Sequence, residues 1–209
     1  MRNGFIYPLI NALVKLLWHV NLVEHVKKFF AWTVAKYHRR TLTKDETVAV
    51  KNFAIDFFII AKWIFVVLAI ALSFSAGWVE MIVWYLIASN LFTYFYYHVW
   101  GSGFALRGDV DSQRRRYANF LLSLSFYIAC YAYLYQFQYA QQIGWPENVI
   151  DTVNALYLSI ATAFTLTYGG FTPLTQTTRV LFATELINTF FFFTIIIVNS
   201  VPSSQNSEK

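Results

Sequence analysis

Four long apolar stretches dominate the pattern of hydrophobic and polar positions along this chain. They cover residues 57–78, 81–100, 117–136 and 180–200. Because an α-helix rises about 1.5 Å per residue, roughly 20 apolar residues cross the roughly 30 Å hydrocarbon layer of a bilayer. A tight turn at residues 75–77 separates the first two stretches, and a polar linker at residues 138–151 follows the third. The pattern predicts an all-α membrane protein with four transmembrane helices.

The first 53 residues are amphipathic. Apolar residues recur at helical spacing over residues 5–40, and basic residues lie between them: Lys15, Lys27, Lys28, Lys36, Arg39 and Arg40. This pattern predicts interfacial helices on a bilayer with anionic headgroups, and packing beneath the spans is the alternative. Thr43 and Glu46 have the spacing of a capping box, so a helix is expected to begin there. Two transmembrane helices then occupy residues 54–100.

The composition and charge of the chain fit a membrane protein. Of its 209 residues, 57% are hydrophobic and 13% are charged, whereas about 25% are charged in a typical soluble domain. The net charge of +5 would suggest nucleic acid in a soluble protein, but the basic residues gather in the N-terminal segment and in a loop at residues 101–116. The positive-inside rule makes both regions cytoplasmic, together with the tail at residues 201–209. We therefore expect an integral multi-pass protein of the cell membrane (plasma or inner) with both termini cytoplasmic and no nucleic-acid partner.

The stretch between the last two spans is too short and too polar to be a fifth one. Residues 151–164 suit a helix that enters from outside and ends near the middle of the membrane. Residues 165–170 are then non-helical backbone at that depth, which is tolerated only where it is buried in protein or lines a water-filled path. Their carbonyls, threonine hydroxyls and glycines can replace the water shell of a cation. The segment therefore suggests an ion path.

The sequence from Ala155 to Pro173, ALYLSIATAFTLTYGGFTP, resembles the pore domain of tetrameric potassium channels. It aligns without gaps to the family pattern A-L-Y-F-S-x-x-T-x-T-T-V-G-Y-G-D-x-x-P, and the resemblance covers about residues 117–200. It implies an outer helix, a re-entrant pore helix, a filter loop and an inner helix in a homotetramer that conducts K⁺ passively, with no other cofactor. The implied filter residues are Thr165, Leu166, Thr167, Tyr168 and Gly169, and the first four would hold the K⁺ ions through their oxygens.

The same resemblance implies roles for residues of the last span. The face formed by Phe190, Phe193 and Ile197 would line the cavity, where rings of phenylalanine can constrict the path; packing against lipid or neighbouring helices is the alternative. Arg179 matches a basic residue that is common at the start of the inner helix and supports the filter. We expect Glu185 to make a structural hydrogen bond to the pore-helix region rather than to bind the ion, because a charge at that depth is costly without a partner.

Three departures from the family pattern leave other functions open. Thr167 stands where the family has a glycine with positive φ, which would strain a β-branched residue by about 1–3 kcal/mol per chain. Gly170 replaces an aspartate, and Thr189 stands where many relatives have a hinge glycine. A weakly selective monovalent cation channel is therefore one alternative, and a non-conducting scaffold or accessory subunit is another.

A membrane enzyme is the least favoured function. His98, Glu185 and the few other candidates cannot be assembled into an acid–base pair, a nucleophile with its base, or a metal cluster. The sequence carries no gating motif, so lipid, tension, pH and a separate gating subunit all stay open as triggers.

Overall fold

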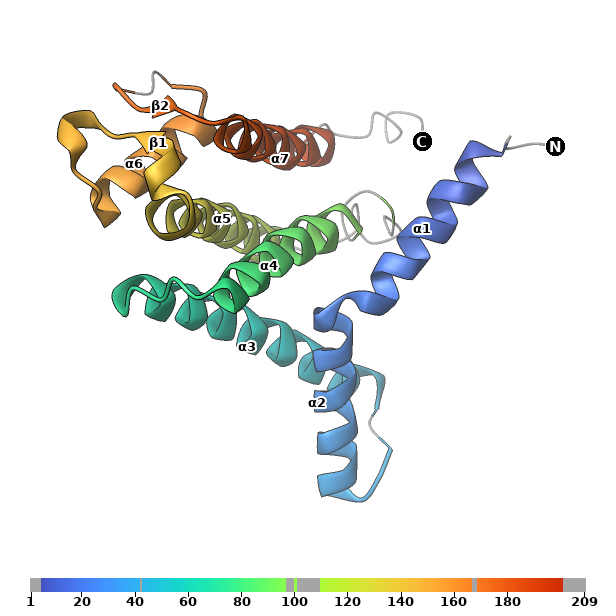
Figure 1. Ribbon diagram of the computed structural model, residues 1–209. Helices are drawn as coiled ribbons and strands as arrows, with labels where there is room; N and C mark the ends of the chain where they lie inside the picture. The colour runs from blue at the N-terminus through green and yellow to red at the C-terminus, as the bar shows by residue number, and fades with distance from the viewer. Residues whose placement is uncertain (1–4, 42, 97–99, 101–109, 167–168, 201–209) are drawn as a thin grey trace. The chain divides into compact units, whose positions relative to one another are not determined.

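The structure is a computed structural model that describes residues 5–41, 43–96, 100, 110–166 and 169–200, and these residues are mostly helical (Figure 1). The chain divides into two compact units, Met1–Phe65 and Val66–Lys209. Within the described residues two helices are long and apolar enough to cross a membrane, Lys44–Ala71 and Tyr117–Gln138. A third results if the bent pair at the N-terminus counts as one span. The sequence pattern predicts four.

The N-terminal unit begins with two helices joined at Asn21. Helix α1 (Ile6–Val20) and helix α2 (Leu22–His38) meet at an angle of 51°, and the Asn21 side chain caps α2 by accepting a hydrogen bond from the backbone N–H of Val23 at 3.2 Å. The side chain of Phe30 on α2 packs against the rings of Phe53 and Phe57, with ring centroids 5.9 and 5.3 Å apart. Two amphipathic helices are therefore present where the sequence predicts them.

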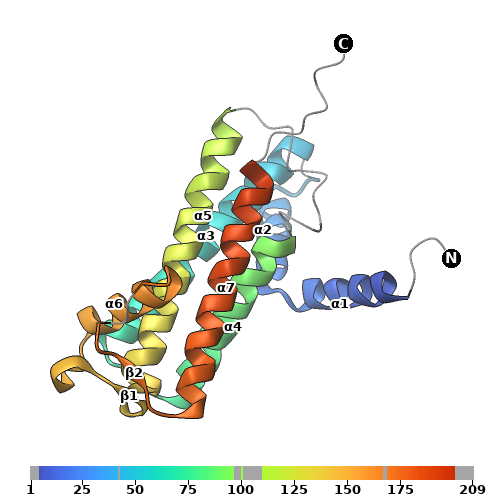
Figure 2. The same ribbon diagram turned by 90° about the horizontal axis from the view of Figure 1, so that it is seen from above.

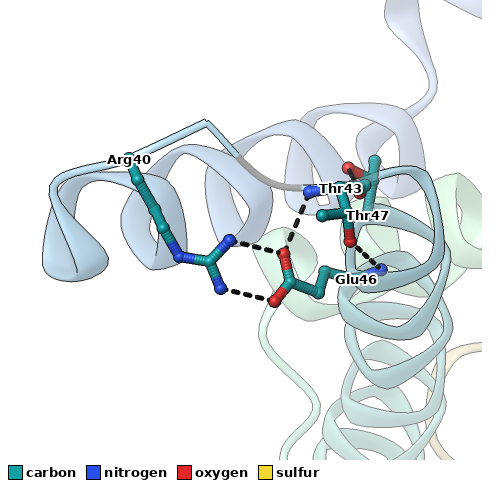
Figure 3. A network of polar contacts seen from close by, with 4 residues as sticks. All are labelled: Arg40, Thr43, Glu46 and Thr47. Atoms are coloured by element: carbon teal, nitrogen blue, oxygen red, sulfur yellow. Dashed lines mark hydrogen bonds and ion pairs between the residues drawn. The ribbon is translucent and has the colours of Figure 1, made fainter.

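Helix α3 (Lys44–Ala71) begins with the predicted capping box, which Figure 3 shows from close by. The backbone N–H of Thr43 donates to the Glu46 carboxylate at 2.9 Å, and the N–H of Glu46 donates to the Thr43 hydroxyl at 3.3 Å. The Arg40 guanidinium donates to both carboxylate oxygens of Glu46. This hydrogen bond is the main reason that the pKa of the Glu46 carboxyl, on the polar first turn of α3, falls to about 2. The prediction of a helix start here is confirmed.

The end of α3 corrects the predicted boundary of the first apolar stretch. The helix stops at Ala71 rather than near residue 78, because Ser73 adopts the left-handed conformation, with φ 52°. The N–H groups of Ser73 and Phe74 then donate to the carbonyls of Ile70 and Ala69, as in a Schellman cap. Helix α4 (Gly77–Phe95) begins four residues earlier than the second predicted stretch.

The start of α5 (Val110–Tyr133) corrects the predicted basic loop. Residues 110–116 are helical, whereas the sequence analysis places residues 101–116 in a loop; the remainder of that loop, residues 101–109, lies outside the described part of the chain. The segment from Val110 to Arg116 contains neither glycine nor proline, and arginine is a good helix former. The helix therefore extends into the polar region.

The C-terminal unit is built on α4, α5 and α7 (Gln176–Ser200), which lie side by side in both views (Figures 1 and 2). Its core is aromatic, and the largest fully buried side chains include Phe126, Tyr127, Tyr131, Tyr133, Tyr135 and Phe192. The Asn90 amide on α4 donates to the backbone carbonyl of Ser123 on α5 at 3.1 Å. A polar side chain in the middle of an apolar helix needs a hydrogen-bond partner of this kind on a neighbouring helix.

Short elements gather at the C-terminal end of α5. They are the π-helix η3 (Leu134–Gln138), the 3₁₀ helices η4 (Ala140–Gln142) and η5 (Pro146–Asn148), the strands β1 (Ile143–Gly144) and β2 (Thr172–Pro173), and the helix α6 (Thr152–Ala163). Strands β1 and β2 pair antiparallel, with Ile143 opposite Pro173 and Gly144 opposite Thr172. The polar linker after α5 is thus joined to the segment that follows α6.

Candidate functional site

The short helix expected between the last two spans is present as α6. The Asp151 carboxylate caps it by accepting a hydrogen bond from the backbone N–H of Asn154 at 2.7 Å. Its 12 residues span about 18 Å at the usual helical rise, well short of the roughly 30 Å hydrocarbon layer. The helix packs against both α5 and α7, and it buries Ala155, Leu158, Ser159, Ala161, Thr162 and Ala163.

Helix α6 ends at a left-handed threonine. Thr165 has φ 56°, and its N–H donates to the Thr162 carbonyl at 3.2 Å, while the N–H of Leu166 donates to the Ala161 carbonyl at 2.8 Å. This is a Schellman cap in which a β-branched residue occupies the position that usually holds glycine. The sequence pattern predicts backbone strain at Thr167, which lies outside the described residues; Thr165 is a further threonine with a strained backbone.

Replacing Thr165 with glycine is expected to stabilise the protein by about 1–2 kcal/mol, because glycine adopts the left-handed conformation without the steric cost that threonine bears. Thr165→Val keeps the branched Cβ and removes the hydroxyl, so it is expected to unfold like the wild type. Denaturation of both variants in detergent measures the difference. A Thr165→Gly variant that is no more stable than Thr165→Val would contradict the strain.

The described positions of the predicted filter, Thr165, Leu166 and Gly169, are not helical, and a second glycine, Gly170, follows them. Thr165 and Leu166 are exposed, and Gly169 and Gly170 have φ values of 56° and 95°. Thr167 and Tyr168 lie outside the described residues. The two left-handed glycines precede β2, which pairs with β1, so after them the chain returns to the linker that follows α5.

Aromatic side chains surround this return. The ring of Phe171 lies 5.5 Å from that of Trp145 and 6.0 Å from that of Tyr157, and the indole N–H of Trp145 donates to the carbonyl of Ala140 at 2.8 Å. A Cβ atom built on Gly169 would lie 3.2 Å from the Tyr157 ring. Apolar packing therefore holds the loop at Gly170, where the family pattern has an aspartate.

The carboxylate of Glu185 is fully buried between three helical elements. One oxygen lies 2.5 Å from the hydroxyl of Ser159 on α6, and the other accepts a hydrogen bond from the hydroxyl of Tyr135 on η3, also at 2.5 Å. The hydrogen bond to the short helix is the contact that the sequence analysis expects for this residue. Glu185 thus joins α7 to α6 and to the end of α5.

Further hydroxyl groups of α5 bond to the same turn of α7. The Tyr127 hydroxyl donates to the Glu185 carbonyl at 3.2 Å, and the Tyr131 hydroxyl donates to the Thr184 hydroxyl at 3.2 Å. The sequence analysis does not assign these tyrosines, although Tyr127, Tyr131 and Tyr135 recur every fourth residue and so share one helical face. This spacing of three tyrosines on one span, together with an acid on another span, is the signal that would have identified them.

A cavity of about 550 Å³ opens beside the C-terminal end of α6. Phe190 and Phe193 of α7 both line it, and the ring of Phe193 lies 5.8 Å from that of Phe164. Thr189 also lines it, and its buried hydroxyl is without a hydrogen-bond partner among the described residues. The side chain of Ile197 lies outside the described part, and Arg179 is exposed on the first turn of α7.

Comparisons of the chain with protein-family models, with curated proteins and with solved structures find no match. The arrangement is therefore interpreted from its own geometry. A half-length helix, a strained turn and a glycine return lie between two long helices, with a buried acid behind the helix and an apolar cavity at its end.

Proposed function

We propose that this chain is the subunit of a homotetrameric channel that conducts potassium passively across a membrane. The observation that supports it most is the order of elements in the C-terminal unit: α5, the capped short helix α6, the non-helical segment that starts at Thr165, and α7. The residues of that segment align with a potassium-channel filter without gaps. In the proposed channel K⁺ binds to oxygens of Thr165, Leu166, Thr167 and Tyr168, with Gly169 completing the filter.

A tetramer is part of the proposal because one short segment cannot surround an ion, whereas copies related by a rotation axis can. The exposed side of α6 carries apolar residues at positions i, i+4 and i+7: Val153, Tyr157 and Ile160. A neighbouring subunit would cover this stripe. The C-terminal end of α6, which carries the negative end of the helix dipole, would then face the shared cavity lined by Phe190 and Phe193.

The proposed topology has four spans: α3, α4, α5 with η3, and α7. Both termini would be cytoplasmic, in the plasma or inner membrane, and α1 and α2 would lie on anionic headgroups. Two features support this orientation: the basic residues concentrate before residue 54 and within residues 101–116, and the turn between α3 and α4 and the linker at residues 138–151 contain neither lysine nor arginine.

Reversal potentials of the purified protein in planar bilayers test the proposal. With potassium chloride at different concentrations on the two sides, the reversal potential is expected to lie close to the potassium equilibrium value and to change little when sodium is added to one side. Currents that ignore the potassium gradient would overturn the proposal. A monomer without current would favour the non-conducting scaffold or accessory subunit.

A weakly selective monovalent cation channel is the second candidate, and Thr167 in place of glycine favours it. If Thr167 disturbs the filter, then Thr167→Gly is expected to raise the permeability ratio of potassium over sodium by about tenfold, the effect of about 1.4 kcal/mol. Bi-ionic reversal potentials measure this ratio. An unchanged ratio would mean that Thr167 does not limit selectivity.

A further inference from the structure

Glu185 on α7 is a buried acid whose side chain is hydrogen-bonded but is 0% exposed. The ion pairs of Lys27 with Glu24 and of Arg40 with Glu46 lie in the N-terminal unit and do not include Glu185. Between residues 117 and 178 the sequence contains no lysine, arginine or histidine, and the next basic residue, Arg179, is exposed. A buried carboxylate without a cation is strongly disfavoured in an apolar medium.

The groups that surround Glu185 are neutral hydroxyls. Tyr135 on η3 and Ser159 on α6 bond to its carboxyl group. Tyr127 on α5 bonds to its backbone carbonyl, and Tyr131 on α5 bonds to the hydroxyl of Thr184 beside it. The acidic residue of α4 in this unit, Glu80, accepts a hydrogen bond from Tyr139 at 2.7 Å instead. With neutral groups around it, the protonation state of Glu185 can be inferred by counting the protons that its hydrogen bonds require.

The Ser159 hydroxyl makes two short contacts with acceptors. Its oxygen lies 2.9 Å from the backbone carbonyl of Ile128 and 2.5 Å from Glu185. Three contacts must each contain a proton: Ser159 with the Ile128 carbonyl, Ser159 with Glu185, and Tyr135 with Glu185. A hydroxyl has one proton and a carbonyl oxygen can only accept, so with an ionised Glu185 only the two hydroxyl protons would be available for these three contacts. A protonated Glu185 supplies the third proton.

We propose that Glu185 is a neutral carboxylic acid that donates its proton to Ser159, and that this bridge positions α6. Ser159 then donates its own proton to the Ile128 carbonyl, and Tyr135 donates to the second oxygen of Glu185. Each contact has one proton and each hydroxyl donates once. The chain of hydrogen bonds links α7, α6 and α5 without burying a charge. That the bridge also positions the ion filter rests on the proposed function.

Infrared spectroscopy of the full-length protein at neutral pH tests the protonation state. The difference spectrum between the wild type and Glu185→Gln is expected to contain the C=O stretch of a protonated carboxylic acid, which shifts in D₂O. An ionised carboxylate does not have this C=O band and absorbs in a different region of the spectrum. A difference spectrum with carboxylate bands in its place would overturn the proposal.

Two substitutions at the same position test the bridge independently. The glutamine amide is neutral and has the shape of a carboxylic acid, with an NH₂ group (two N–H donors) in place of the O–H and a carbonyl oxygen that accepts. Glu185→Gln is therefore expected to unfold within about 2 °C of the wild type. Glu185→Ala removes the carboxyl group that joins Ser159 to Tyr135 and leaves a cavity between α7 and α6, so it is expected to lower the unfolding midpoint by at least about 5 °C. An equal decrease of the unfolding midpoint in Glu185→Gln and Glu185→Ala would overturn the proposal.

Current recordings separate this inference from the proposed function. If the wild type carries no potassium current, the proposed function fails, whereas the spectrum and the two midpoints still decide the state of Glu185. If it conducts, Glu185→Gln is expected to keep the wild-type conductance and to be less sensitive than the wild type to alkaline pH, because it has no proton to lose. A tenfold lower conductance in Glu185→Gln at neutral pH would overturn the positioning role.

Discussion

Gly169→Ala is expected to reduce potassium conductance by at least about tenfold. Gly169 has φ +56°, where an L-residue with a side chain costs about 1–2 kcal/mol more than glycine. The added Cβ would also lie 3.2 Å from the ring of Tyr157, so the loop or the ring must shift. In a tetramer four copies carry this strain together, and about 1.4 kcal/mol already corresponds to a factor of ten.

The matched control for this substitution is Gly77→Ala at the start of α4. A Cβ atom at Gly77 meets nothing within 4 Å, so this variant is expected to conduct like the wild type. Single-channel recordings together with size-exclusion profiles distinguish an altered ion path from misfolding. Wild-type conductance in Gly169→Ala would show that the segment from Thr165 to Gly169 does not form the filter.

Phe192→Ala is expected to have the largest effect on stability, a loss of about 3–5 kcal/mol. The side chain is fully buried, and its ring lies 5.4 Å from that of Tyr94 and 5.6 Å from that of Tyr127. Its removal leaves a cavity among aromatic rings from α4 and α5, which rigid helices refill only in part. Unfolding in detergent, followed by tryptophan fluorescence, measures the loss.

Phe190→Ala is the matched control, because Phe190 lies two residues away on the same helix and is 68% exposed in the single chain. Its removal is expected to cost less than about 1 kcal/mol, as is usual for exposed positions. In the proposed channel it would change the conductance instead, since Phe190 lines the cavity. A stability loss in Phe190→Ala as large as that in Phe192→Ala would contradict the packing of α7.

Features that depend on neighbouring residues could be predicted from the sequence. The capping box at Thr43 and Glu46 is a local pattern with a fixed spacing, and so is the capped short helix that begins after Asp151. That Asn90 forms a hydrogen bond to a neighbouring helix could also be expected, because a polar side chain inside an apolar bundle must form one.

Features that depend on tertiary contacts could not be predicted. The left-handed conformation of Ser73 and Thr165 is one of them, because glycine is the usual residue at such a helix end. The end of α6 itself lies within one residue of the predicted end at residue 164. The strands β1 and β2 have two residues each, too few for a recognisable alternation of polar and apolar positions. The partners of Glu185 become visible only when η3 and α6 are placed against α7.

The pairing of β1 with β2 limits where foreign sequence can be placed in the linker at residues 138–151. A side chain at Gly144 would force the Thr172 side chain to move, because a Cβ atom there would lie 2.4 Å from the Thr172 hydroxyl. The Gln142 carbonyl accepts hydrogen bonds from Leu174 and Thr178. Residues 147–150 are exposed and lie beyond this pairing. An epitope or a fluorophore site inserted there would report surface exposure in intact cells, whereas the same insertion at Gly144 would separate the linker from the loop that follows the glycines.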